Sequence, residues 1–299
     1  MRRLPVVLSL ALAGASVVAA APRSLVAQRY GADDYTAPRA ATVDARGARR
    51  LEVEGKAGGL RIRGVDGLTE VRVRGTARAS RREWLEEIRL VARREGDAVV
   101  VRADIPDREY GWSDGNHSRA LDLVLEVPRG IAADVSDGSG EVEIRGVGAL
   151  SLKDGSGEID VEDVASARID DGSGEIRVRD VRGDLRLNDG SGSIDAAGVR
   201  GSVVIESDGS GGVDVRDVGG DFTIQDGRGR GVTYRDVRGQ VRVPVDHRSI
   251  ERARERAERE RERALERADR ERERALDRAA RDRDRALRER ERAYRRTWY

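Results

Sequence analysis

Residues 154–192 read DGSGEIDVEDVASARIDDGSGEIRVRDVRGDLRLNDGSG and contain the tetrapeptide Asp-Gly-Ser-Gly three times. The copies along the chain begin at Asp137, Asp154, Asp171, Asp189, Asp208 and, in the altered form DGRG, at Asp226. Their spacings are 17, 17, 18, 19 and 18 residues. A short and regular period of this kind is typical of a solenoid, in which each repeat forms one coil.

Each repeat holds two short runs in which apolar residues alternate with polar ones, for example Ile159 and Val161, then Ala167 and Ile169. An alternation with period two predicts strands with one buried face. Three residues beyond the first run stands a further aliphatic residue, which we interpret as the corner where the chain turns. The corner residues are Val147, Val164, Val181, Val199, Val218 and Val237. Because repeat length varies only outside the runs, we expect turns to absorb the extra residues.

These patterns predict an all-β fold, a parallel β-solenoid of two-strand coils with a period of 17–19 residues, over residues 131–245. In the Asp-Gly-Ser-Gly turn, glycine allows a positive φ, and Asp or Ser accepts hydrogen bonds from nearby backbone N–H groups. Stacked aspartates also suggest calcium, as in the calcium-binding β-roll with its nonapeptide GGxGxDxUx. The order D-G-S-G, once per coil and with no Asp two residues after the second glycine, departs from that motif. We therefore predict a structural turn, with no metal and no cofactor.

The N-terminus has the pattern of an export signal. Arg2 and Arg3 precede an apolar run that ends at Val18, and cleavage after Ala20 or Ala27 fits the small residues that follow. The run is shorter than the ~20 residues that span a membrane. We expect a signal peptide over residues 1–27, a flexible segment over 28–48, and an exported protein in the periplasm, at the cell surface or outside the cell. The chain has no cysteine, which excludes disulfides, thiolate metal sites and cysteine nucleophiles.

Residues 49–130 predict an irregular, β-rich N-terminal part of the same sheet system. Three pairs of alternating apolar residues indicate strands, namely Leu51 and Val53, Leu60 and Ile62, and Val71 and Val73. Ser80 and Glu83 have the spacing of a capping box ahead of a short helix with Trp84, Leu85 and Ile88. We expect that helix to cap the open end of the solenoid, since exposed strand edges promote aggregation.

The C-terminal segment, residues 249–299, predicts a long Arg/Glu-rich α-helix. Residues 251–299 contain 19 Arg and 14 Asp+Glu, without Gly or Pro, and Leu265, Leu276 and Leu287 are eleven residues apart. This helix could serve as a rigid spacer, associate with a second copy, or bind an anionic surface.

Two aromatic segments are candidates for binding a partner. The loop over residues 106–118 carries Tyr110 and Trp112, and the end of the chain carries Trp298 and Tyr299. Exposed rings at such places grip sugars or proteins, although rings of a surface loop also pack back onto the fold. The charged outer faces of the strands are either solvated surfaces or a flat surface for a protein or polysaccharide.

The stretches LDLVLEVPRGIAADVSDGSGEVEI (residues 121–144) and GVRGSVVIESDGSGGVDVRDVGGDFTI (residues 198–224) resemble a bacterial family named "putative adhesin". The likeness rests on an entry of the type L-x-V-x-V-P-x-G, here LVLEVPRG with Leu125 at the third position, and on repeated GSG-(E/D)-(I/V) and V-x-G-(D/S)-(L/V) motifs over residues 45–245. It implies an exported β-strand-repeat domain of unknown function, and no catalytic or binding residues come with it. The Arg/Glu-rich tail departs from the family.

The residue types argue against an enzyme. The chain has only His117 and His247, and it lacks the GxSxG, HExxH and phosphate-loop motifs. The balance of 57 Lys+Arg against 56 Asp+Glu leaves no field that would attract nucleic acid. We predict a non-catalytic, adhesin-like protein of the cell envelope or surface that binds a protein or glycan. The alternative is a structural scaffold or spacer in the envelope, with the charged helix as rigid arm or oligomeriser.

Overall fold

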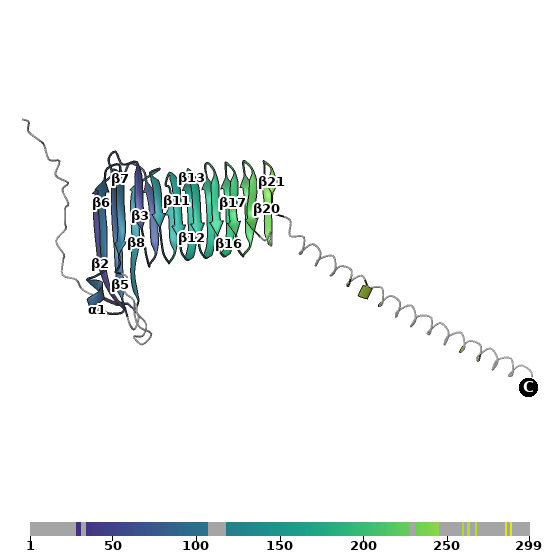
Figure 1. Cartoon of the computed structure of the whole chain (residues 1–299), viewed down its shortest axis with the longest axis horizontal. Coiled ribbons are helices and arrows are strands. Elements are labelled where there is room, and N and C mark those ends of the chain that lie inside the picture. Colours follow the sequence, from purple (N-terminus) through teal and green to yellow (C-terminus); the bar gives the residue numbers. More distant parts are fainter. Residues whose placement is uncertain are drawn as a thin grey trace, which may run out of the picture. The chain divides into compact units, whose positions relative to one another are not determined.

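The computed structural model describes residues 28–30, 34–106, 118–227 and 231–244, and six residues of the C-terminal segment (Figure 1). Contacts between backbone positions divide the chain into two compact units, unit 1 up to Ala165 and unit 2 from Ser166. Within residues 28–244, the described chain is β-strand apart from turns and one short helix, α1 (Arg82–Leu85). The predicted all-β fold with a parallel β-solenoid is confirmed.

Unit 2 consists of coils, and each coil contributes one strand to each of two sheets. Sheet 2A has the order β14 (Gly174–Val181), β16 (Gly192–Val199), β18 (Val213–Val218) and β20 (Val232–Val237). Sheet 2B has the order β13 (Ser166–Asp171), β15 (Leu185–Asp189), β17 (Val203–Asp208), β19 (Phe222–Gly227) and β21 (Val241–Arg242). All these strands pair in parallel, and Ile176 lies opposite Ile194, which lies opposite Val213. The inward aliphatic residues of successive coils therefore form vertical rows between the sheets.

One expected turn insertion lies inside a strand. In the pairing of β15 with β17, Leu187 lies opposite Ile205, whereas Asn188 lies opposite Ser207. Glu206 is thus the extra residue of the 19-residue repeat, and it forms a β-bulge at the end of β17. The expectation that turns alone absorb length differences is wrong at this point, because a bulge adds a residue without moving the buried positions before it.

Each corner valine follows a residue in the left-handed conformation. Asp163, Asp180, Asp217 and Asp236 have φ of 54° to 56°, and Gly146 and Gly198 have φ of 73° and 70°. Gly and Asp are among the residues that tolerate this conformation. Five of the six corner valines, up to Val218, are fully buried. The corners are therefore made by a Gly or Asp followed by a buried Val.

The two glycines of each Asp-Gly-Ser-Gly turn are required for different reasons. The second has a positive φ, 152° at Gly192, and a Cβ there would lie 1.5 Å from the carbonyl oxygen of Gly174. The first has no positive φ, yet a Cβ at Gly190 would lie 2.4 Å from the carbonyl oxygen of Gly172. At both positions a side chain would collide with the backbone of the neighbouring coil, and at the second position the positive φ is an additional reason for glycine.

Unit 1 also has two sheets, but its strands do not stack in chain order. Sheet 1A has the order β1 (Gln28–Tyr30), β2 (Asp34–Asp44), β5 (Glu70–Ala79), β8 (Arg119–Pro128), β4 (Leu60–Val65), β10 (Val142–Arg145) and β12 (Gly157–Val164). Sheet 1B has the order β11 (Ala149–Asp154), β9 (Ala132–Ser136), β3 (Arg50–Glu54), β7 (Ala98–Asp104) and β6 (Arg89–Glu95). The coil made of β3 and β4 therefore lies between later segments of the chain, with β7 and β8 on one side and β9 and β10 on the other.

The segment expected to be flexible, residues 28–48, instead contains β2, which pairs antiparallel with β5 from Tyr35 to Asp44. Ala37, Val43 and Ala45 are buried there. Small alanines and the interruption by Pro38 weaken the alternating pattern, so the strand is hard to recognise from local sequence.

The predicted capping helix is present, but it differs in two respects. Helix α1 begins after Arg81 with no side-chain cap, and the Ser80 hydroxyl instead accepts a hydrogen bond from the Ser118 N–H.

Helix α1 lies beside the ends of β2 and β5 (Figure 1). The Arg39 guanidinium donates to the carbonyl oxygens of Leu85 and Ile88. The Trp84 ring is buried with the guanidinium groups of Arg81 and Arg119 at 4.9 and 4.3 Å from its centre. The edge strands of unit 1 at this end are β1 and β6, so strands rather than the helix form the end.

Two further predictions fall largely outside the described residues. The signal peptide, residues 1–27, lies outside them. Of the predicted C-terminal helix, the structure describes Arg259, Glu262, Arg263, Arg267, Arg285 and Arg288, each helical and exposed. A continuous helix over residues 249–299 therefore stays a prediction. Among the described helical residues, no helix is both long and apolar enough to cross a membrane.

Candidate contact surface

The four residues predicted to bind a partner, Tyr110, Trp112, Trp298 and Tyr299, lie outside the described residues. The structure does describe the base of the aromatic loop. Lys56 Nζ donates to the Ile105 carbonyl oxygen at 3.0 Å, and the Arg119 guanidinium donates to the Pro106 carbonyl oxygen at 3.3 Å. The loop thus starts from an anchored position, and its role in binding stays a prediction.

The aspartates of the repeated turn lie in the core and not on the surface. Asp137, Asp154, Asp171, Asp189 and Asp208 are all at most 8% exposed, at the third inward position after two aliphatic residues. The Asp189 Oδ1 atom accepts a hydrogen bond from the Ser191 N–H at 3.2 Å, while its Oδ2 atom is buried without a hydrogen-bond partner. The Asp-Gly-Ser-Gly motif therefore forms the turn that we predicted from the sequence.

Burial raises the pKa of four of these aspartates, Asp137, Asp154, Asp189 and Asp208. Burial raises the pKa of Asp137 to about 6, with a further contribution from Asp154. Burial likewise raises the pKa of Asp189 to about 6, with contributions from Asp171 and Asp208. No group of three or more His, Cys, Asp or Glu in the described ranges could hold a metal ion. We interpret these stacked carboxyls as structural groups of the turn.

The outer face of sheet 1A is covered by ion pairs across neighbouring strands. The Arg61 guanidinium on β4 pairs with the Glu143 carboxylate on β10. Arg145 Nε lies 3.1 Å from Glu143 Oε1 and 3.3 Å from Glu162 Oε2, and Arg72 reaches Glu126 on β8 at 3.7 Å. Charges on this face are largely satisfied by one another, which makes it a solvated surface of the kind that keeps sheets soluble.

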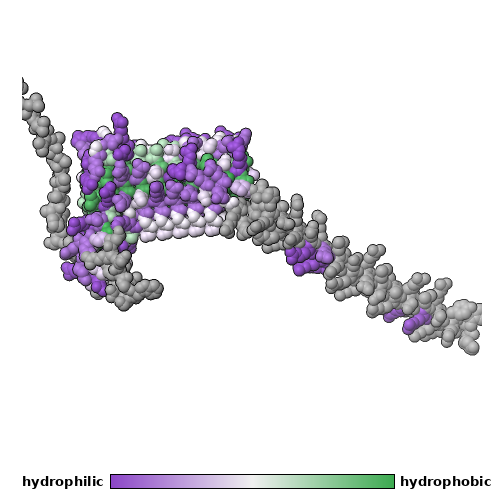
Figure 2. Space-filling view, in the orientation of Figure 1, coloured by the Kyte–Doolittle hydropathy of each residue, from purple (hydrophilic) through white to green (hydrophobic). Residues whose placement is uncertain are grey.

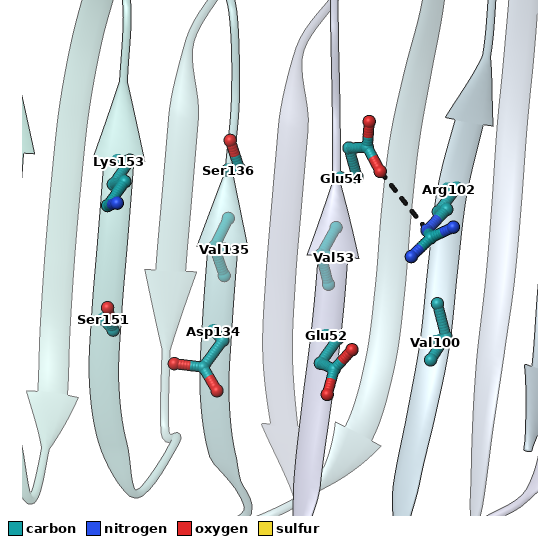
Figure 3. Close-up of a pocket in the computed structure, with 10 residues that line it drawn as sticks. All are labelled: Glu52, Val53, Glu54, Val100, Arg102, Asp134, Val135, Ser136, Ser151 and Lys153. Carbon is teal, nitrogen blue, oxygen red and sulfur yellow. Dashed lines mark ion pairs between the residues drawn. The ribbon is translucent and has the colours of Figure 1, made fainter. Parts of the chain in front are cut away.

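The outer face of sheet 1B differs, because it contains a shallow groove of about 410 Å³ in which only some of the charged side chains are paired (Figure 3). Ten residues from β3, β7, β9 and β11 line it, namely Glu52, Val53, Glu54, Val100, Arg102, Asp134, Val135, Ser136, Ser151 and Lys153. Figure 2 shows hydrophilic side chains, with apolar residues between them, on the strands seen in that view.

The strand register arranges the outward side chains of the groove in two rows. In one row, Glu52 lies opposite Val100 on one side and opposite Asp134 on the other, and Asp134 lies opposite Ser151. In the other row, Glu54 lies opposite Arg102 on one side and Ser136 on the other, and Ser136 lies opposite Lys153. The only ion pair between lining residues joins Arg102 Nε to Glu54 Oε2 at 3.2 Å (Figure 3).

The charges of the groove are only partly compensated within the sheet. Glu52 and Asp134 lie directly opposite each other on neighbouring parallel strands, and like charges in that position destabilise a sheet. Glu52 is paired with Arg50 at 2.9 Å, whereas no ion pair or hydrogen bond joins the Asp134 or Lys153 side chain to another described residue. The groove therefore presents one carboxylate, that of Asp134 on β9, and one ammonium group, that of Lys153 on the neighbouring strand β11, without ion partners among the described residues. Its lining residues do not include a pair of acids that face each other across a cleft.

Sequence reasoning did not identify this groove. Its central strand, β3, comes from a segment more than 70 residues before β9, and only the insertion of β3 between β7 and β9 joins the rows. The sequence does contain a signal for this insertion, because residues 62–65 and 144–147 both read Ile-Arg-Gly-Val. In the structure these two segments belong to β4 and β10, which pair with Ile62 opposite Ile144.

Comparison with known proteins gives similarity at the level of solved structures. No family model matches the chain, and no curated protein is significantly similar to it. A structure named "putative cell adhesion protein" from Clostridium sporogenes is 12% identical, covering 69% of this chain and 98% of that chain, with a TM-score of 0.29. A "putative adhesin" from Parabacteroides distasonis is 12% identical, with coverages of 69% and 96% and a TM-score of 0.33. A "putative lipid binding protein" from the same organism is 11% identical, with coverages of 68% and 96% and a TM-score of 0.28.

The second of these structures carries the name of the family that the repeat resembles, and the first is likewise named for cell adhesion. At this identity and TM-score, the similarity says nothing about what this chain binds, so the candidate surface rests on its own geometry.

Proposed function

We propose that the protein is a non-catalytic exported protein of the cell envelope or surface, which binds a protein or glycan partner through the outer face of sheet 1B. The observation that carries the proposal is the contrast between the two outer faces of unit 1. On sheet 1A most outward charges are paired with one another, with Arg63 as an exception, whereas the groove on sheet 1B holds two neighbouring charged residues, Asp134 and Lys153, without ion partners among the described residues. Unpaired charges at the rim of a contact surface steer and orient a partner at small cost to the fold.

Binding of the purified full chain to isolated cell envelopes, measured by co-sedimentation, tests this proposal. We expect saturable binding that weakens as salt is raised, because exposed charges are screened over about 10 Å at 0.1 M ionic strength. The double variant Asp134→Lys/Lys153→Glu keeps the net charge and should weaken binding about tenfold or more, the size of two lost charge contacts.

The matched control is Arg74→Glu, a charge reversal on the exposed face of sheet 1A, which should leave binding unchanged. Treatment of the envelopes with protease or with glycosidases then separates a protein partner from a glycan. Absence of saturable binding, or equal loss in the control, would refute the proposal. Detection of the uncleaved chain in the cytoplasm would refute the exported location.

A structural scaffold or spacer in the envelope is the second candidate function. It is favoured by the last coil of unit 2, because an assembly needs contacts between its parts and the inward residues Val232, Tyr234 and Val237 on β20 are not buried. Self-association through the C-terminal helix, which the sequence also allows, belongs to this candidate.

A further inference from the structure

The last coil of unit 2 leaves its inward side chains uncovered. Val213, Val215 and Val218 on β18 are at most 1% exposed, and their register partners on β20 are Val232, Tyr234 and Val237. None of these three partners is buried, and Tyr234 is 52% exposed. Val241 on β21, opposite the fully buried Phe222, is also partly exposed. The side chains that form the core in every earlier coil of the unit thus form a surface here.

Tyr234 departs from the residues that precede it in its row. The same register position holds Val178, Ala196 and Val215 in the earlier coils of unit 2, all fully buried. A tyrosine ring is much larger than these side chains, and its centre lies 6.0 Å from that of Phe222. Tyrosine is enriched where proteins contact one another, because it offers apolar area together with a hydroxyl group.

The backbone of the last coil is open as well. β20 is the end strand of sheet 2A and β21 that of sheet 2B. β21 has two residues and is followed shortly by Pro244, which blunts that edge, whereas β20 has six residues, with neither a proline nor an inward charge. Such an edge presents unpaired N–H and C=O groups that only another strand satisfies in full.

The composition of the C-terminal segment does not favour a strand at this position. Residues 251–299 consist mainly of Arg, Glu, Asp, Ala and Leu, with Thr297 as their single β-branched residue. Helix-forming composition of this kind disfavours a strand. An edge strand of a second copy has both the missing hydrogen-bonding groups and the missing apolar cover, and it is complementary by symmetry.

We propose that this end of unit 2 is an interface between two copies of the chain, in which β20 pairs antiparallel with β20 of the partner and Tyr234 packs into the partner's uncovered row of valines. A two-fold axis normal to the sheets keeps the inward side chains of both copies inside. A six-residue strand is about 20 Å long and the two sheets are about 10 Å apart. This footprint is smaller than the roughly 800 Å² per partner of a standard interface, so the dimer is a weak one with a dissociation constant in the micromolar range.

Sedimentation equilibrium of the full chain over a range of concentrations tests the interface. The mean mass should rise from that of a monomer towards that of a dimer. Tyr234→Arg should raise the dissociation constant at least tenfold, because it places a charge in the apolar contact of each copy. Gln225→Arg adds the same charge at an exposed outward position of β19 and should not change it. Thermal melting of both variants checks that the fold is retained.

Three results would overturn the proposal. The first is a monomer at every soluble concentration. The second is a dimer unaffected by Tyr234→Arg but lost in Leu265→Lys/Leu276→Lys/Leu287→Lys, which would place the contact in the C-terminal segment. The third is protection of the outward amides of β20, those of Val232, Tyr234 and Asp236, from hydrogen exchange at concentrations where the protein is monomeric. It would mean that another part of the chain covers the edge.

Discussion

At the scale of single residues, the repeated aspartate has two roles that conflict. Its Oδ1 atom closes the turn by accepting the N–H of the serine two residues on, as Asp189 does from Ser191. Its position is nevertheless an inward one at the end of a core strand, where a charge is poorly solvated. A raised pKa follows from this conflict, and it makes stability depend on pH in an unusual direction.

The pH dependence can be predicted from Asp189, whose pKa of about 6 in the folded protein exceeds the ordinary aspartate value of 3.8. Because the pKa is raised in the folded state, folding favours the protonated form, and the stabilising effect is complete below about pH 4 and lost as the pH rises through 6. Asp189→Asn keeps the turn acceptor and removes the charge. We expect it to raise the free energy of unfolding by about 1–3 kcal/mol at pH 8 and to have little effect at pH 4.

Urea unfolding of wild type and variant at several pH values measures this difference. Asp180→Asn is the matched control, since Asp180 is exposed and asparagine also tolerates its left-handed conformation. A variant less stable than wild type at pH 8 would show that the buried carboxylate is stabilised in its charged form, contrary to our prediction.

At the scale of elements, the coil of β3 and β4 is the main departure from chain order. Its strands continue the parallel ladder, with Leu60 opposite Val142 in one sheet and Leu51 opposite Ala133 in the other. Its turn has glycine at position 55, where the later repeats have the buried aspartate, and a Cβ there would lie 2.0 Å from Asp137 Oδ1. The coil is therefore adapted to lie next to the first Asp-Gly-Ser-Gly turn.

An engineered disulfide tests this order of strands. Arg61 and Glu143 lie directly opposite each other on neighbouring parallel strands, about 4.8 Å apart at Cα, which is within the range that a disulfide spans. Because the natural chain has no cysteine, the pair Arg61→Cys/Glu143→Cys should form one disulfide on mild oxidation, seen as a mobility shift without reductant.

The pair Arg61→Cys/Asp160→Cys serves as the control, because Asp160 lies opposite Glu143 and is one strand further away, about 10 Å from Arg61. It should stay reduced. A disulfide in the control and none in the first pair would mean that β4 does not lie beside β10.

At the scale of the whole molecule, stability comes from many equivalent layers and not from one large core. Aromatic residues are only 3% of the chain, and the largest fully buried side chains are aliphatic apart from Phe222. In such a protein, each coil contributes mainly through contacts with its neighbours, so the number of coils is not critical but the integrity of each coil is.

Removal of one complete repeat tests this additivity. Deletion of residues 190–208 joins Asp189 to Gly209 and restores an intact Asp-Gly-Ser-Gly turn. We expect this chain to fold and unfold cooperatively, with a lower denaturation midpoint, since one interface between coils is lost. Circular dichroism during urea unfolding measures both properties.

Deletion of residues 200–208 is the control, because it removes half a coil and brings β16 directly to the turn before β18. Successive strands would then compete for the same sheet, and we expect no cooperative transition. Equal folding of both chains would show that the coils are not the units of stability.

The sequence by itself determined the period, the two buried rows per coil, the corner valines and the nature of the repeated turn. Each of these depends on residues close together in the chain, where sterics and burial leave a period of two and a glycine requirement visible in the letters. Only the tertiary structure decided that β3 and β4 insert between later strands, that β2 completes the sheet, that Glu52, Asp134 and Lys153 share one groove, and that the row ending at Tyr234 is uncovered. Those features depend on which strand edges meet, and partners far apart in the chain are selected by the competition between edges in the folded molecule.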